Sequence, residues 1–91
     1  MRRIDGKYHI ENEQIVKTTN GTVVPTEEPL FLLRGRDRNA LPLLEAYYAI
    51  CEADGCNEEH LSGIDRIICE FENFRNRNRE VMKQPGCTYG K

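Results

Sequence analysis

The sequence has no tryptophan, and no apolar run in it approaches the roughly 18 residues that a membrane-spanning helix needs. Its start, MRRIDGKYHI, is charged but lacks the apolar segment that follows the basic residues of a signal peptide. Basic residues are not in excess either, because 13 Lys and Arg stand against 15 Asp and Glu and give a formal net charge of −2. No global positive field is therefore present to hold duplex nucleic acid. We expect a soluble, cytosolic protein without a membrane or duplex partner.

Residues with nucleophilic or acid–base chemistry are few. Ser62 is the only serine, and it precedes Gly63 in a predicted helix instead of standing on a nucleophile elbow. Cys69 falls on the core side or margin of the same helix, where a thiol is inert. Glu27 and Glu28 share a proline-bounded loop, but no further feature of a catalytic site accompanies them. The sequence therefore predicts that the protein is not an enzyme.

The cysteines at 51, 56, 69 and 87 are even in number, as a disulfide framework requires. Without a signal peptide, reduced thiols are the better interpretation. Cys51, Cys56 and His60 supply metal-ligand side chains within ten residues. Zinc sites usually pair their ligands as CxxC, however, and Cys51 falls inside a predicted helix while Cys56 falls in the following turn. We expect joint ligation to be strained, and we predict no metal site and no cofactor.

Ninety-one residues, 38% of them apolar and 31% charged, predict a single folded domain over residues 1–91. A chain of this size buries only about 60 to 65% of the surface that its unfolded form exposes. We therefore do not expect a large enclosed site within one copy, and a homo-oligomer would be the way to form one.

The first third of the chain predicts a small antiparallel β-meander. β-favouring runs at residues 8–10, 15–18 and 22–24 are separated by turn-forming residues. Asn20-Gly21 is the strongest hairpin signal, because a type I′ turn needs positive φ at both central positions. Residues 11–13 predict a looser turn. After a connector bounded by Pro25 and Pro29, Leu30–Leu33 predicts a buried strand or an extended segment under the helices, so that the β region covers residues 7–34.

The rest of the chain predicts an antiparallel α-helical hairpin over residues 40–77. A proline costs a helix least stability in its first turn, so Pro42 predicts a helix over 40–53 with Asn39 as its N-cap. Asp54-Gly55 follows the last turn and closes this helix. Asn57, followed by two glutamates, starts a second helix over 58–77. Residues 79–91 then read as a loosely packed tail. The fold class is α+β, a small β-meander followed by the helical hairpin.

Three arginines stand at alternate positions, Arg34, Arg36 and Arg38, between the predicted strand and the first helix. In extended backbone their side chains would share one face, about 6.6 Å apart, which is close to the spacing of successive phosphates. Guanidinium groups bind phosphate bidentately, and a helix N-terminus adds free N–H groups. The alternative is that Asp37 and nearby glutamates pair with these arginines on the surface.

Other residues suit the remainder of a nucleotide. Tyr8 and Tyr47 are candidates to stack on a base, and Lys17 is a candidate to reach a phosphate. The alternatives are a half-buried strand position for Tyr8 and a core position for Tyr47. Arg75 and Arg79 share a helix face and complement the helix dipole. They would form a second anion-binding site if the tail folded back over them.

The segments EEPLFLLRGRDRNALPLLEAYY, HLSGIDRIICEFENF and VMKQPG resemble small proteins of tailed bacteriophages over about residues 28–86. Small phage proteins of this kind often counter host defence. The resemblance therefore implies an anti-defence protein in the host cytoplasm, similar in style to viral nucleotide sponges, which are oligomers that hold immune signals between copies. Anti-CRISPR proteins, which bind a host effector protein, provide the alternative.

Together, these observations predict a phage anti-defence protein that sequesters an anionic, nucleotide-derived immune signal without cleaving it. The alternative is a protein-binding inhibitor of a host defence complex. The predicted ligand-binding residues are Arg34, Arg36, Arg38, Tyr8, Lys17 and Tyr47, and the predicted assembly is a homo-oligomer.

Overall fold

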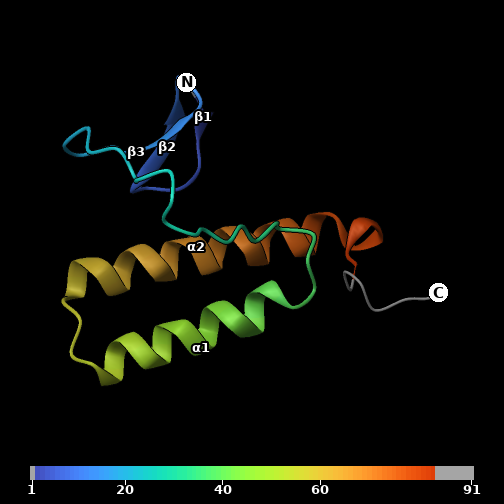
Figure 1. Cartoon of the computed structure of the whole chain (residues 1–91). Coiled ribbons are helices and arrows are strands. Elements are labelled where there is room, and N and C mark those ends of the chain that lie inside the picture. The colour runs from blue at the N-terminus through green and yellow to red at the C-terminus, as the bar shows by residue number, and fades with distance from the viewer. Residues whose placement is uncertain (1, 84–91) are drawn as a thin grey trace. The chain divides into compact units, whose positions relative to one another are not determined.

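The computed structural model describes residues 2–83 and divides by its internal contacts into two compact units, one ending at Phe31 and the other beginning at Leu32 (Figure 1). The first unit holds a three-stranded antiparallel sheet and the second holds two packed helices. The predicted α+β class, a meander followed by a helical hairpin, is confirmed. The single domain over residues 1–91 stays a prediction. No helix in residues 2–83 is long and apolar enough to cross a membrane.

The sheet has the order β1-β2-β3, with bounds Arg2–Arg3, Tyr8–Glu11 and Gln14–Lys17. β1 was not foreseen, because two arginines carry no β pattern. It forms where Arg3 pairs with His9, which in turn pairs with Val16 on β3. His9 and Val16 are the buried residues of this unit.

The tight two-residue turn of the meander lies at Asn12-Glu13. The prediction that Asn20-Gly21 forms this turn is wrong. Asn12 and Glu13 have positive φ of 52° and 63°, as a type I′ turn requires, and they connect the paired residues Glu11 and Gln14. At the second reversal, Gly21 has positive φ, its N–H donates to the Lys17 carbonyl oxygen at 2.8 Å, and the loop is wider.

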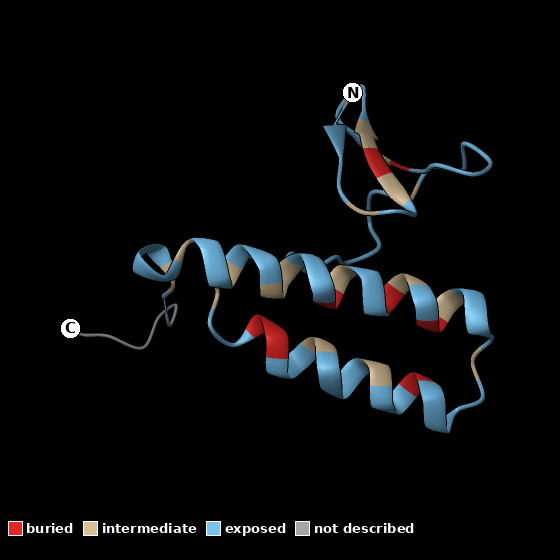
Figure 2. Cartoon of the chain, turned by 180° about the vertical axis from the view of Figure 1, so that it is seen from behind, coloured by how far each residue is buried: buried red, intermediate tan, exposed pale blue. Residues whose placement is uncertain are grey.

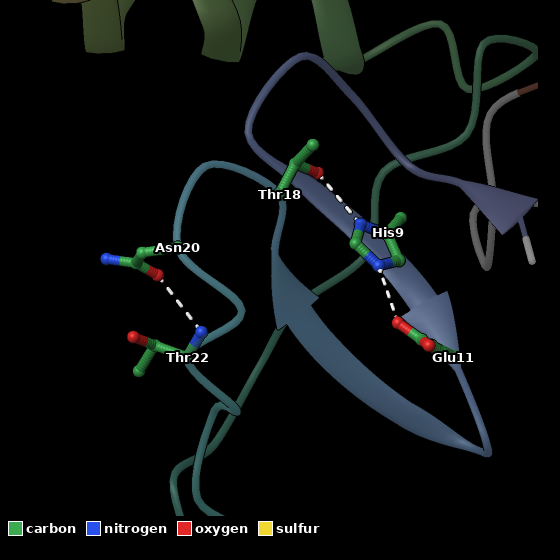
Figure 3. Close-up of polar contacts among 5 residues, drawn as sticks. All are labelled: His9, Glu11, Thr18, Asn20 and Thr22. Atoms are coloured by element: carbon green, nitrogen blue, oxygen red, sulfur yellow. Dashed lines mark hydrogen bonds and ion pairs between the residues drawn. The ribbon is translucent and has the colours of Figure 1, made fainter.

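The side chain of Asn20 supports this wider loop by accepting the Thr22 N–H at 3.0 Å (Figure 3). Residues 22–24 do not become a strand, because Val23 makes only an isolated bridge to Val16. The side-chain hydrogen bond of Asn20 therefore holds a local turn where the dipeptide predicted a two-residue hairpin.

The predicted buried strand at Leu30–Leu33 is also wrong, and residues 30–32 are not the packed extended segment that was its alternative. No strand is assigned there, and Leu30, Phe31 and Leu32 are 62%, 84% and 71% exposed. An apolar run becomes a buried strand only where neighbouring strands pair with it, and the described sheet ends at β3.

Both helices have the bounds that the sequence predicted, α1 at Ala40–Ala53 and α2 at Glu58–Arg77. Gly55, at φ +79°, ends the first helix. The Asn57 side chain caps the second by accepting the His60 N–H at 2.8 Å. Asn39 occupies the N-cap position of α1, but its side chain makes no capping bond.

The core of the helical unit is a seam between α1 and α2. Figure 2 shows its buried residues on the sides of the two helices that face each other. They are Leu41, Cys51, Leu61, Ile64 and Ile68, with Leu44, Tyr48, Cys56 and Phe71 packed against them. This seam packs the two helices of the hairpin against each other.

Candidate functional site

The RGRDR segment is a turn and not an extended rim. The Asp37 N–H donates to the Arg34 carbonyl oxygen at 3.0 Å, with Gly35 and Arg36 at the central positions of the turn. The prediction that Arg34, Arg36 and Arg38 share one face of extended backbone is therefore wrong. Gly35 permits the turn to lie against α2, because a Cβ at this position would come within 3.3 Å of the Phe74 ring.

The chain after α2 returns to this turn. It forms a short 3₁₀ helix, η1, at Arg79–Val81, and then the Lys83 N–H donates to the Arg36 carbonyl oxygen at 2.8 Å. The Arg38 N–H donates to the Lys83 carbonyl oxygen at 2.7 Å, which completes a parallel bridge between Asp37 and Lys83. The first residues of the predicted tail are thus folded back, and residues 84–91 lie outside the part that the structure describes.

A cavity of about 460 Å³ opens where these segments meet. Three arginines line it: Arg38 before α1, Arg75 in the last turn of α2, and Arg79 one turn further along the chain. Its other lining residues are Gly35, Asp37, Leu41, Pro42 and Met82. We refer to this cavity as the arginine pocket.

The arginine pocket has an excess of positive charge, since three arginines and one aspartate line it. Asp37 already accepts the Asn39 N–H at 2.8 Å. Within residues 2–83, none of Arg38, Arg75 and Arg79 lies within ion-pair distance of a carboxylate, and Arg75 Nε donates to Asn76 at 3.4 Å. The surface ion pairs that the sequence offered as an alternative for Arg34, Arg36 and Arg38 are not found within residues 2–83 either.

The predicted site residues fall into separate groups. Tyr8 and Lys17 are paired across β2 and β3, in the first unit. Tyr47 is on α1, 48% exposed, with its ring edge-on to His60 at a centroid distance of 6.4 Å. Of the six predicted residues, only Arg38 lines the arginine pocket. The other two arginines of the pocket, Arg75 and Arg79, were expected from their shared helix face to bind an anion if the tail folded back over them.

His9, near Tyr8, is buried and serves the sheet. Its Nδ1 lies 2.9 Å from Thr18 Oγ1, and its Nε2 lies 3.1 Å from Glu11 Oε1 (Figure 3). A ring held on both nitrogens and buried on β2 is not available to stack on a base.

A second cluster lies at the other end of the hairpin, where α1 turns into α2. The side-chain sulfurs of Cys51 and Cys56 and a ring nitrogen of His60 all lie within 4.8 Å of one another. Cys51 and Cys56 have the helix and turn positions that the sequence predicted. The geometric objection to joint ligation is nevertheless wrong, because the turn returns Cys56 and His60 toward Cys51.

No protein-family model, curated protein or solved structure matches this chain. The fold and the two clusters define a small α+β protein with a cationic pocket at one end of a helical hairpin and a thiol–imidazole cluster at the other.

Proposed function

We propose that this protein binds and sequesters a phosphate-bearing, nucleotide-derived immune signal in the arginine pocket, without cleaving it. The main support for this proposal is that Arg38, Arg75 and Arg79 come from three segments and line one cavity. Arginine forks suit phosphate oxygens because two parallel N–H groups donate to one group. The cavity volume of about 460 Å³ falls in the range of small-molecule sites.

The remaining walls suit the less polar part of such a ligand. Leu41, Pro42 and Met82 add apolar lining to the pocket beside its charged residues. No aromatic residue of the described chain lines it. Recognition would therefore rest on the phosphates, with a base or sugar held by apolar contact or by a second copy of the chain.

The biological setting of the proposal comes from the resemblance to small phage proteins. A protein of that origin would act in the host cytoplasm, would be a homo-oligomer and would lower the free concentration of a cyclic nucleotide or an ADP-ribose derivative. Arg34, Arg36, Tyr8, Lys17 and Tyr47 do not line the arginine pocket, and their ligand contacts stay predictions.

Thermal unfolding with a panel of cyclic di- and trinucleotides and ADP-ribose derivatives tests the proposal. A ligand at 100 times its dissociation constant should stabilise the protein by about 2.7 kcal/mol. Chromatography of the released ligand should recover it unchanged, since sequestration does not cleave it. Absence of stabilisation by every member of the panel would contradict the proposal.

A second candidate function, a protein-binding inhibitor of a host defence complex, is favoured by one observation. Leu30, Phe31 and Leu32 form a consecutive apolar run that is largely exposed, and exposed apolar patches mark interaction surfaces. Capture of a purified defence complex by the protein, lost on changing Phe31 to Ser, would support this function. Equal capture by the variant would contradict the assignment of the surface.

A further inference from the structure

We infer that Cys51, Cys56 and His60 form a binding site for a thiophilic divalent metal ion, best suited to zinc. The three side chains come from the last turn of α1, the connecting turn and the first turn of α2. Their ligand atoms all lie within 4.8 Å of one another.

The distances between the three ligand atoms are close to those expected in a zinc-bound site. Zinc binds sulfur at about 2.3 Å and imidazole nitrogen at about 2.0–2.1 Å, so tetrahedral ligand atoms stand roughly 3.5–3.8 Å apart. Cys51 Sγ and His60 Nε2 are already 3.8 Å apart. The other pairs, at no more than 4.8 Å, need to close by at most about 1.3 Å, which side-chain rotation can supply.

The backbone holds the ligands in this arrangement. The Cys56 N–H donates to the Cys51 carbonyl oxygen at 3.0 Å, and Gly55, at φ +79°, reverses the chain between them. The N–H of His60 is fixed by the Asn57 side chain at 2.8 Å. The order C-x4-C-x3-H therefore brings its three ligands together through one capped turn, with no contribution from distant segments.

The donor set selects the metal. Two thiolates and one imidazole are soft and borderline ligands, which suit zinc or cobalt and not magnesium or calcium. Two thiolates also balance the charge of a divalent ion. Cys51 is buried, whereas Cys56 and His60 are half-buried. Three protein ligands would leave the fourth tetrahedral position to water or a further ligand.

The inferred metal site and the arginine pocket lie at opposite ends of the hairpin (Figure 1). Along α1, Leu41 at the pocket and Cys51 at the metal site are separated by about 15 Å, at about 1.5 Å per residue. Metal binding would link the two helices at their connecting turn and would stabilise the hairpin, because the folded chain holds the ligands closer together and should bind the metal more tightly than the unfolded chain does. The two sites can be tested independently.

Titration of the reduced full-length protein with cobalt(II) is the direct test. Binding should produce a thiolate-to-cobalt charge-transfer band and the visible d–d bands of a tetrahedral ion, and stoichiometric zinc should abolish both. Zinc should also raise the melting temperature. Cys56→Ser and His60→Gln should weaken cobalt binding by more than the roughly 10–100-fold that loss of an outer-shell partner produces.

The matched control is the double variant Cys69→Ser/Cys87→Ser, which removes the other two cysteines and keeps the three inferred ligands. It should bind one cobalt ion per chain with unchanged spectra. Circular dichroism of each variant establishes that it is folded, and His60→Gln provides the ligand test if Cys56→Ser is not. The inference is overturned if the wild type gives no charge-transfer band, if His60→Gln binds cobalt as tightly as the wild type, or if the double variant loses the ion.

Discussion

The backbone N–H of Arg38 donates to the carbonyl oxygen of Lys83 at 2.7 Å. This hydrogen bond joins the residue that precedes α1 by two positions to the segment that follows α2, although the two residues are 45 positions apart in the sequence. It places the Arg38 segment beside the helix end that carries Arg75 and Arg79. The cationic pocket therefore depends on how the chain closes on itself after α2.

Arg75→Gln and Arg79→Gln should each weaken binding of a phosphate-bearing ligand by about 1.5–3 kcal/mol, or roughly tenfold or more, because each removes charge-assisted hydrogen bonds. Arg77→Gln is the matched control, since Arg77 lies between them in sequence, is exposed and does not line the pocket. Calorimetric titration with the ligand that stabilises the wild type provides the affinities. Equal losses in all three variants would point to general charge instead of the pocket.

Asp37→Asn should strengthen anion binding by about 1 kcal/mol, because it removes the negative charge from the pocket. An asparagine side-chain oxygen can still accept the Asn39 N–H that Asp37 Oδ1 accepts at 2.8 Å. The gain should shrink as salt is raised, since ions screen the interaction. Weaker binding with an unchanged fold would show that the carboxylate takes part in recognition.

Asn57→Ala should destabilise the helical unit by about 1 kcal/mol, because the side chain caps α2 through the His60 N–H. Asn39→Ala should cost much less, since Asn39 stands at the N-cap of α1 without a side-chain capping bond. Chemical denaturation followed by helix circular dichroism compares the two variants. Equal costs would contradict the difference between the caps.

Gly63→Ala should stabilise the helical unit by about 0.5–1 kcal/mol, since alanine favours a helix interior and a Cβ at Gly63 meets nothing within 4 Å. Gly35→Val should destabilise it by about 1–3 kcal/mol, because a Cβ there already comes within 3.3 Å of the Phe74 ring. Chemical denaturation midpoints measure the expected gain of stability in Gly63→Ala and the expected loss in Gly35→Val. A stable Gly35→Val protein would mean that Phe74 can move aside.

Glu13→Gly should stabilise the sheet by about 1 kcal/mol, because Glu13 has φ of 63°, a conformation that costs an L-residue energy. Gly21→Ala should destabilise its loop for the same reason, at φ of 76°. Amide hydrogen exchange in β2 and β3 measures the change in this unit alone. Faster exchange in Glu13→Gly would contradict the assignment of the tight turn.

The helices could be predicted because their signals are local. Pro42, Gly55 and Asn57 act within one turn of a helix end, so their positions determine the bounds whatever else packs nearby. The meander could be predicted as a class but not in its turns. Asn12-Glu13 and Asn20-Gly21 both allow positive φ, and strand pairing decides which of them becomes the two-residue turn.

The candidate site could be predicted only in its chemistry. The sequence indicated arginines near a helix start, but it could not show that Arg34–Asp37 would form a turn, or that Lys83 would return to it. It also placed Cys51, Cys56 and His60 near one another in the chain without showing that their ligand atoms would converge. A side chain's direction depends on turn geometry, and the residue letters specify that geometry poorly.

The sequence by itself determined the α+β class, the bounds of both helices and the residue types available for binding, because hydrophobic period and capping are local properties. Only the tertiary structure decided which of those residues meet. Arg38 joins Arg75 and Arg79, and not Arg34 and Arg36, because a backbone bridge between Asp37 and Lys83 closes the end of the hairpin. Such long-range pairing depends on the whole fold, since each partner must be brought into position by segments that pack elsewhere.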